Sequence, residues 1–467
     1  MSAPDTAALA AAVGRHLGSS VEVRDLVRLS GGASRETWAF DATPVDGAPL
    51  ELVLRRDPGA SVGQSARETE FELLRAAGAG GVAVPAATFV LEPADDLGSG
   101  FVMERIEGET IPRRILRDDE YADARSKLAG QCGTAAARIH ALDVADLPDL
   151  PVLGAREQIA QYRGVLDSIG EPHPAFELVL GWLEEHAPPP VEPRLVHGDF
   201  RNGNLVVGPD GLRAVLDWEL AHLGDPVEDL GWCCVRSWRF GNGDQPVGGF
   251  GSVADLLDAY VAAGGEPVDP EHLRYWETFG TLKWGVICGG QAFTHLSGMV
   301  RSVELATLGR RIAETEWDVL RLVAGSRVSD GAPDLQPVEP PAGFQDRPTA
   351  AELLEAVREY LEQDVMPATE GRTSFHARVA VNALGIVERE LLLGPAADAP
   401  VRDRLAALLD GDADPRTLVA ELARRIRDGS LEDRRDEVVS VVVDLVRAKL
   451  TVANPRYLGD LDPSGTR

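Results

Sequence analysis

Lysine is nearly absent from this 467-residue sequence, although Lys and Arg together number 46. The three lysines are Lys127, Lys283 and Lys449. Any strong cation needed in the first 126 residues must therefore come from arginine, whose planar fork is not equivalent to an ammonium group. Cysteine is also scarce, and none of the four cysteines stands in a CxxC pair, which argues against a disulfide framework and a zinc site.

The chain also lacks a net positive charge and long apolar runs. The net charge of −29 at pH 7 argues against nucleic acid and anionic membranes as partners. It suits a cationic substrate, or it serves solubility alone. No apolar run approaches the length of a membrane span, and the first residues lack the basic and apolar segments of a secretory signal. We therefore expect a cytoplasmic protein with no membrane partner.

The first hundred residues predict a small lobe built on a sheet. A helix is expected from Asp5 to Leu17, and a second one over 64–77. Strand-like stretches bounded by turn residues cover 21–29, 37–42, 50–56, 84–91 and 100–104. Together they predict a mostly antiparallel sheet with one helix after its third strand, within an N-terminal lobe over 1–105.

The rest of the chain has mainly helical patterns, and strands interrupt them clearly only around 195–217. We expect a helical lobe over 106–325 and a linker over 326–347, which is rich in Pro, Gly and Asp. A helical bundle is expected over 348–467, opened by a capping box of Thr349 and Glu352. Its further helices are predicted at 375–393, 401–409, 416–427 and 431–452.

The strand pair surrounds an unusual polar cluster: residues 195–219 are LVHGDFRNGNLVVGPDGLRAVLDWE. The pair Asp210-Gly211 predicts a two-residue hairpin turn. If the turn centres there, Asn204 faces Asp217, and cross-strand Cβ atoms lie about 5 Å apart. An amide oxygen and a carboxylate at that spacing could share Mg²⁺, which leaves positions for water and phosphate oxygens. A register slip of one or two residues stays open.

These residues predict three roles in phosphoryl transfer. Asp199 would be catalytic, accepting a proton from an attacking hydroxyl or orienting it, while Asn204 and Asp217 would hold Mg²⁺ on a nucleoside triphosphate. His197 is expected to shape the loop and Arg201 to neutralise nearby charge. The alternative is a polar surface hairpin. The order HxDxxxxN, strand, turn, strand, Asp is specific enough to favour the enzymatic interpretation.

The segment resembles the catalytic and metal-binding motifs of the aminoglycoside phosphotransferase and choline kinase-like family of small-molecule kinases. The resemblance covers about residues 21–320. It implies an α+β, protein-kinase-like two-lobed fold, with a small antiparallel sheet lobe, a helical lobe and ATP in the cleft. The stretches LVLRRDP and LDWELAHLGDP are most similar to kinase-like domains that occur joined to acyl-CoA dehydrogenases.

The resemblance also identifies candidate nucleotide contacts. The turn SGGAS lies where the family covers phosphates, which makes Ser34 a candidate, although an ordinary hairpin turn fits equally well. The third strand of such folds supplies a lysine that pairs with a helix glutamate. Here Arg55 matches the lysine, and Glu70 matches its partner, with Glu68 as competitor. Strand alternation places Arg56 on the other face, so we expect only one of the two arginines to reach the nucleotide.

Two further segments match the family pattern. FVMERIEG resembles the segment that joins the lobes, so Glu104 and Ile106 would bind adenine through main-chain atoms. Asp225 and Asp229 follow the metal aspartate and are expected to brace the catalytic loop and a helix start. Between Asp217 and Asp225 there is no room for a protein-kinase activation segment, and no HRD or APE sequence is present, so a protein substrate is not expected.

The acceptor that receives the phosphate is not defined by these motifs. Arg236, Arg239 and Lys283 could meet a negatively charged acceptor, and tryptophans such as Trp232 and Trp238 could line its pocket. Solvated or paired charges and core aromatics are the alternatives. The resemblance to domains beside acyl-CoA dehydrogenases favours a hydroxyacyl-CoA. An aminoglycoside or amino alcohol is the competing acceptor class, and a non-catalytic nucleotide-binding module is the competing function.

The C-terminal segment resembles an uncharacterised helical domain family found beside or fused to such phosphotransferases. The stretches TSFHARVAVNALGIVERE and KLTVANPRYL carry this resemblance. The expected bundle packs on the kinase or mediates homo-oligomerisation, and both alternatives stay open.

Overall fold

The computed structural model describes residues 3–29, 36–45, 47–57, 64–328, 331–338, 344 and 346–459. The chain forms two compact units. The first combines Met1–Gly154 with Pro190–Leu273, and the second combines Ala155–Pro189 with Arg274–Arg467. The predicted helical lobe over 106–325 therefore contributes to both units. These units divide the chain elsewhere than the predicted domain boundaries, which stay predictions.

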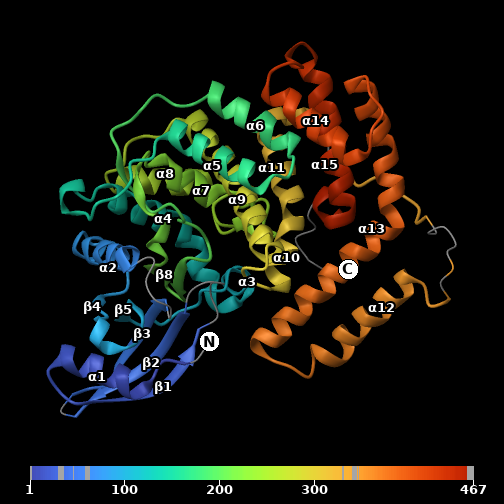
Figure 1. The fold of residues 1–467 in the computed structure, drawn as a ribbon. Helices are drawn as coiled ribbons and strands as arrows, with labels where there is room; N and C mark the ends of the chain where they lie inside the picture. The colour runs from blue at the N-terminus through green and yellow to red at the C-terminus, as the bar shows by residue number, and fades with distance from the viewer. Residues whose placement is uncertain are drawn as a thin grey trace. The chain divides into compact units, whose positions relative to one another are not determined.

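The first unit opens with a five-stranded antiparallel sheet in the order β1-β2-β3-β5-β4 (Figure 1). Its elements are α1 (Thr6–Leu17), β1 (Val21–Arg28), β2 (Glu36–Pro44), β3 (Leu50–Asp57), α2 (Gln64–Ala79), β4 (Ala87–Val90) and β5 (Ser99–Glu104). Alternate residues of β2 and β3, such as Phe40 and Leu54, pack with Leu9 of α1. Because side chains alternate along a strand, Arg55 lies on the face opposite α1.

The remainder of the first unit consists of helices and two short strand pairs. Its elements are α3 (Pro112–Arg117), α4 (Ala122–His140), β6 (Arg194–Val196), β7 (Leu205–Gly208), β8 (Gly211–Val215), β9 (His222–Gly224), α7 (Val227–Cys234) and α8 (Val253–Ala262). The α4 and α8 helices pack closely at Gly133, where a Cβ would lie 2.1 Å from the carbonyl oxygen of Leu256.

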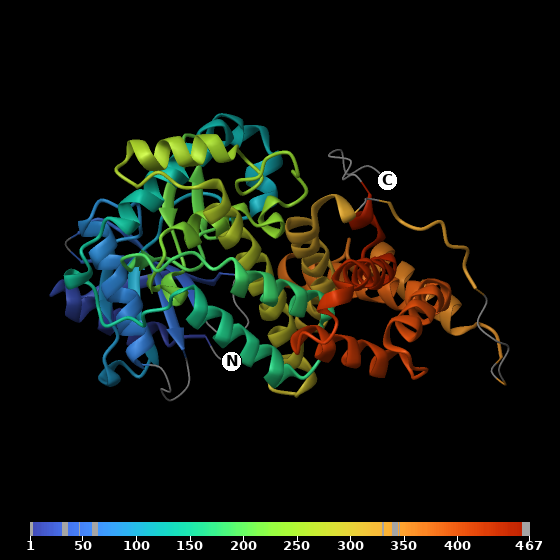
Figure 2. The same cartoon turned by 90° about the horizontal axis from the view of Figure 1, so that it is seen from above.

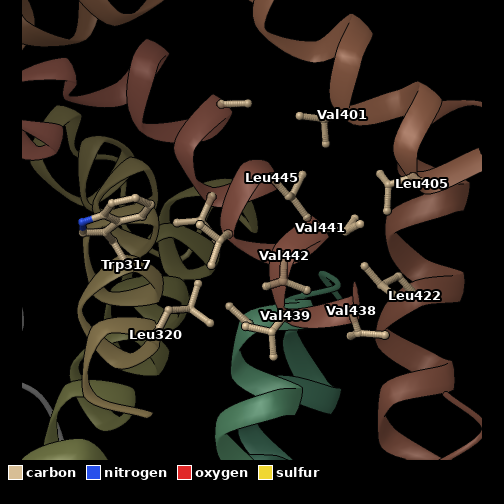
Figure 3. Packing of buried hydrophobic residues seen from close by; sticks show 14 of the residues in the cluster. Trp317, Leu320, Val401, Leu405, Leu422, Val438, Val439, Val441, Val442 and Leu445 are labelled. Carbon is tan, nitrogen blue, oxygen red and sulfur yellow. The ribbon is translucent and has the colours of Figure 1, made fainter. Parts of the chain in front are cut away.

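The second unit is helical in its described part and joins helices from the middle of the chain with those of its C-terminal part. Its elements are α5 (Ala155–Ile169), α6 (Pro174–Glu185), most of α9 (Pro270–Leu296), α10 (Val303–Leu308), α11 (Ile312–Ala324), α12 (Ala350–Tyr360), α13 (Gly371–Leu409), α14 (Pro415–Arg427) and α15 (Arg435–Ala453). The α14 helix lies beside α6, as two views agree (Figures 1 and 2). One core contains Trp317 and Leu320 of α11 together with residues of α13, α14 and α15 (Figure 3).

Most predicted elements form at the expected places. The capping box of Thr349 and Glu352 is present, and the predicted sheet is confirmed strand by strand. One prediction was wrong: the separate helices expected at 375–393 and 401–409 are a single helix, α13, which continues through Pro395 and Pro400. Packing of this segment on α15, through buried Ala397 and Val401, outweighs the helix-breaking tendency of proline. No helix in the described ranges is long and apolar enough to cross a membrane.

Candidate active site

The predicted hairpin forms, but its register differs from the expected one. Leu205 pairs with Val215, and the N–H of Leu216 donates to the carbonyl of Asn204 at 2.8 Å, so the main chain of Asn204 faces Leu216 and not Asp217. Gly208 pairs with Gly211, which makes Pro209 and Asp210 the two turn residues. The expectation of a turn centred on Asp210-Gly211 was therefore wrong by one residue. A bulge between Val206 and Val207 then moves the pairing one residue back toward the expected register.

Asp217 follows the hairpin in a left-handed backbone conformation, with φ 69° and ψ 67°. Such a conformation is uncommon for a residue other than glycine and is typical of functional sites. The turn redirects the side chain, and Asp217 Oδ1 accepts a hydrogen bond from Arg55 Nη2 at 2.5 Å. Direct cross-strand pairing is therefore not what positions Asp217.

The carboxylate of Asp199 is held by three side chains. Its Oδ1 accepts from Arg201 Nε at 2.9 Å and from the indole N–H of Trp232 at 2.8 Å. Its Oδ2 accepts from Asn204 Nδ2 at 2.5 Å. The guanidinium of Arg201 also lies over the ring of Trp238, 4.3 Å from its centroid. Asp199 is thus fixed in one orientation, with the guanidinium of Arg201 beside its carboxylate.

Asn204 is oriented so that its amide oxygen suits a metal ion. Both hydrogen bonds of its Nδ2 go to Asp199, one to the carbonyl at 2.9 Å and one to the carboxylate. No other described residue hydrogen-bonds its Oδ1. Together with the carboxylate of Asp217 this gives an oxygen-only donor set, as Mg²⁺ requires. The residues present therefore fit the predicted magnesium ion.

The α7 helix holds the loop that carries Asp199 through hydrogen bonds to its main chain. Asp229, fully buried in the first turn of α7, accepts the main-chain N–H groups of His197 at 2.8 Å and Gly198 at 2.9 Å. Burial by itself would raise the pKa of Asp229. The interactions of its carboxylate with His140 and His197 together outweigh burial, so the pKa lies below its ordinary value. Gly198 has φ 79°, and a Cβ there would lie 2.3 Å from the carbonyl oxygen of Leu220.

The histidine of the motif has a structural place in this loop. His197 is fully buried, and burial lowers its pKa, which keeps the ring neutral. Its Nδ1 accepts the N–H of Asp199 at 3.2 Å, and its Nε2 donates to the carbonyl of Leu216 at 3.1 Å. The ring thereby connects the loop of Asp199 to the residue before Asp217. Asp225 accepts the N–H of Val227 at the start of α7.

The two arginines of β3 have separate environments. Arg55 Nη1 lies 2.8 Å from Glu70 Oε1, and its Nη2 reaches Asp217. Burial disfavours the charge of Arg55, but Glu70 and Asp217 outweigh it and raise its pKa. Arg56 lies on the other face, where its Nη2 is 2.9 Å from Glu36 Oε2.

Glu70 has a second cationic partner on its own helix. Arg67 Nη1 donates to Glu70 Oε2 at 2.6 Å, and Arg67 Nε donates to Asp57 at 2.8 Å. Both Arg67 and Glu70 are buried. The α2 helix is thus tied to the end of β3 by alternating charges.

The other nucleotide candidates are less defined. Ser34 lies outside the described residues. The N–H of Glu104 already donates to the carbonyl of Ala86 at 2.9 Å, so it is not available to a base. In contrast, no hydrogen bond joins the main chain of Ile106 to another described residue. The hydrogen bond to Ala86 excludes only the N–H of Glu104, and both residues stay predicted main-chain contacts for adenine.

Three of the acceptor candidates, Arg236, Trp238 and Arg239, share the short 3₁₀ helix Arg236–Arg239 of the first unit. The guanidinium of Arg239 donates to the carbonyl of Cys234 at 2.7 Å, at the C-terminal end of α7. Trp238 is buried beneath Arg201. Arg236 is partly exposed in the same short 3₁₀ helix, and Lys283 is buried in the second unit.

Trp232 and Arg67 are the site residues that the sequence did not assign to the catalytic machinery. Trp232 was a candidate only for a pocket wall, yet its N–H holds the carboxylate of Asp199. Its contact partner is 33 residues away, and no local pattern signals such a pairing. Arg67 stands three residues before Glu70 on α2, a spacing that could have indicated their ion pair.

Comparison with known proteins identifies the family. Residues 25–276 match the model of the phosphotransferase enzyme family (APH), and residues 367–457 match a domain of unknown function, DUF6285. The chain is 27% identical over 324 residues to mouse acyl-CoA dehydrogenase family member 10, and 27% identical over 360 residues to "Probable acyl-CoA dehydrogenase IBR3" of Arabidopsis thaliana. These alignments cover 63% and 69% of this chain but only 29% and 42% of the relatives. The chain thus spans less than half the length of these curated proteins.

Solved structures agree on the fold. The crystal structure of a "putative aminoglycoside phosphotransferase" from Ralstonia eutropha is similar with a TM-score of 0.53 and 23% identity, over 68% of this chain and 98% of that one. The predicted α+β, kinase-like fold is thereby confirmed, as are the predicted family and enzyme class. Because the family model covers more than half of its residues, this chain belongs to the phosphotransferase enzyme family.

Proposed function

We propose that this enzyme transfers the γ-phosphoryl group of ATP to a hydroxyl group of a small molecule. The observation that carries the proposal is the fixed carboxylate of Asp199, held by Arg201, Trp232 and Asn204 within the same unit as the Arg55–Asp217 ion pair. Positioning and charge neutralisation supply most of the catalysis in phosphoryl transfer, and both are built into this loop.

In the proposed reaction, Asp199 orients the acceptor hydroxyl and accepts its proton. The acceptor oxygen forms a bond to the γ-phosphorus as the bond from that phosphorus to the β–γ bridging oxygen breaks, and ADP leaves. The hydrogen bonds from Arg201 and Trp232 hold the carboxylate at the angle that the attack requires. The proton then passes from Asp199 to water.

The nucleotide is proposed to bind through charge and main-chain contacts. Arg55 would contact the phosphates, with Glu70 keeping its guanidinium in place. The amide oxygen of Asn204 and the carboxylate of Asp217 would hold Mg²⁺, which neutralises phosphate charge when bound. The main chain of Ile106 is available for the adenine base.

For the acceptor we propose a hydroxyacyl-CoA. Support comes from the relatives, two of which are named acyl-CoA dehydrogenases and align over about two thirds of this chain. Aminoglycosides or amino alcohols are the alternative, because a similar solved structure carries the name aminoglycoside phosphotransferase and the chain has a net charge of −29.

The test is ADP release in the presence of a panel of hydroxyacyl-CoAs, amino alcohols and aminoglycosides. With the active acceptor, Asp199→Asn should turn over about 10²–10⁴-fold more slowly than the wild type, and its affinity for ATP should be unchanged. Asp210→Asn is the matched control, because Asp210 lies exposed in the turn of the same hairpin. Unchanged turnover in Asp199→Asn would refute the catalytic role. ATP binding without turnover on any acceptor would instead support a non-catalytic nucleotide-binding module.

A further inference from the structure

Arg55 connects two carboxylates through separate nitrogens. Its Nη1 is bound to Glu70 at 2.8 Å, and its Nη2 is bound to Asp217 at 2.5 Å, with Glu219 at 3.7 Å from the same nitrogen. We infer that Arg55 is the counter-ion of Asp217 in the nucleotide-free enzyme, so that a divalent metal binds there effectively only together with the nucleotide. This inference rests on the proposed function.

Arg55 forms two ion pairs, called here the Glu70 arm and the Asp217 arm, and they differ in how easily they can break. The Glu70 arm is buried, and Arg67 holds Glu70 from its other oxygen while itself bound to Asp57. The Asp217 arm is the more accessible one, since the side chain of Asp217 is 31% exposed and that of Glu70 only 2%. If one partner is to be exchanged, it is therefore Asp217, and Glu70 keeps the guanidinium in the site.

Charge explains why the exchange needs a nucleotide. Among the described residues of this network, Arg55 and Arg67 face four carboxylates, and such a group of acids attracts a divalent cation. A metal ion alone must compete with a permanently charged guanidinium for Asp217. A phosphate group offers that guanidinium a bidentate replacement for the carboxylate it loses.

The consequence is a positive coupling between metal and nucleotide. Each should raise the affinity of the enzyme for the other by the same factor, because coupling between binding equilibria is reciprocal. Removal of the guanidinium should release Asp217 to bind metal without nucleotide, and it should weaken nucleotide binding at the same time.

The experiment is a Mn²⁺ titration of the nucleotide-free, full-length protein, followed by electron paramagnetic resonance of the free ion. Arg55→Met should bind Mn²⁺ at least tenfold more tightly than the wild type. Arg55→Lys, which retains one charged nitrogen for Glu70 and gives up the fork, should bind it at least threefold more tightly. Arg105→Met is the control, since Arg105 pairs with Asp41 and Glu51 in the same unit and should leave Mn²⁺ affinity unchanged.

Asp217→Asn separates the two ways in which the idea could fail. If Asp217→Asn abolishes Mn²⁺ binding with the nucleotide present, but both Arg55 variants bind the ion as weakly as the wild type, the counter-ion role of Arg55 is refuted and the proposed metal site stands. If Asp217→Asn leaves Mn²⁺ affinity unaltered in every background, the metal site of the proposed function is refuted with it. Arg55→Lys keeps the test decisive should Arg55→Met not fold.

Discussion

Lys449 neutralises a fully buried acid of the second unit. Glu316 is fully buried on α11, and the ammonium of Lys449 on α15 lies 3.0 Å and 2.9 Å from its two oxygens. His173 Nδ1 adds a contact to Glu316 Oε1 at 2.9 Å. Replacement of Lys449 by methionine keeps the aliphatic length but removes the charge, so Glu316 is left as an uncompensated anion inside the protein.

The pKa of Glu316 sets the size of the effect. Burial by itself would raise this pKa. The interactions with Lys449 and His173 outweigh burial and lower the pKa from an ordinary 4.5 to about 2. At about 1.4 kcal/mol per pH unit, the fall of the pKa from 4.5 to about 2 corresponds to about 3 kcal/mol, which agrees with the ~3–5 kcal/mol cost of breaking a buried ion pair. Because the folded-state pKa is depressed, this stability is present above about pH 4.5 and is lost as the pH falls toward 2.

The assay is urea unfolding of the full chain at pH 7, followed by tryptophan fluorescence, since Trp317 lies in the core next to Glu316. Lys449→Met should lose about 3 kcal/mol of unfolding free energy, and the difference from the wild type should shrink as the pH is lowered below 4.5. Lys127→Met is the control, because Lys127 forms an exposed pair with Asp123 worth at most about 0.5 kcal/mol. Equal stabilities of the two variants would refute the reasoning.

Two further predictions concern Asp199 and the C-terminal helices. Trp232→Phe removes one charge-assisted hydrogen bond to Asp199, so steady-state kinetics should show kcat lowered about 10- to 100-fold with the KM for ATP unchanged; an unaltered kcat would contradict the positioning role. Deletion of the residues after Gln336 removes helices that cover Trp317 and Leu320, so the shortened chain should be insoluble or aggregated on size exclusion. A soluble monomer that unfolds cooperatively would show that the helical domain is dispensable.

The sequence predicted the separation of Arg55 from Arg56 because strand alternation is a local rule. Adjacent residues of a strand face opposite sides, and here one side carries Glu70 and the other carries Glu36. The hairpin around Asp210 was predictable for the same reason, since its turn residues are contiguous. Its register was not, because glycines at both ends of the turn allow more than one closure and a bulge shifts the pairing again.

The partners of the C-terminal helices could not be predicted from their sequence. An apolar stripe shows that a helix face must be covered, but it does not say by which element. In the structure the stripe on α15 is shared between α13, within the same predicted bundle, and α6 and α11, from the predicted phosphotransferase lobe. The C-terminal helices therefore pack on helices of the predicted phosphotransferase lobe within the same chain, which was one of the two open alternatives. Self-association through these helices stays a prediction.

The absence of lysine from the first 126 residues has a structural consequence at Arg55. A lysine at this position would have to contact both carboxylates through the N–H groups of a single nitrogen, whereas the two terminal nitrogens of Arg55 contact Glu70 and Asp217 separately. Arginine holds both carboxylates at once, and its charge cannot be removed by deprotonation. If Asp217 binds a metal ion as proposed, the guanidinium must find a new partner before Asp217 can accept that ion. On this proposal the arginine that departs from the kinase pattern connects phosphate anchoring to metal binding through a single side chain.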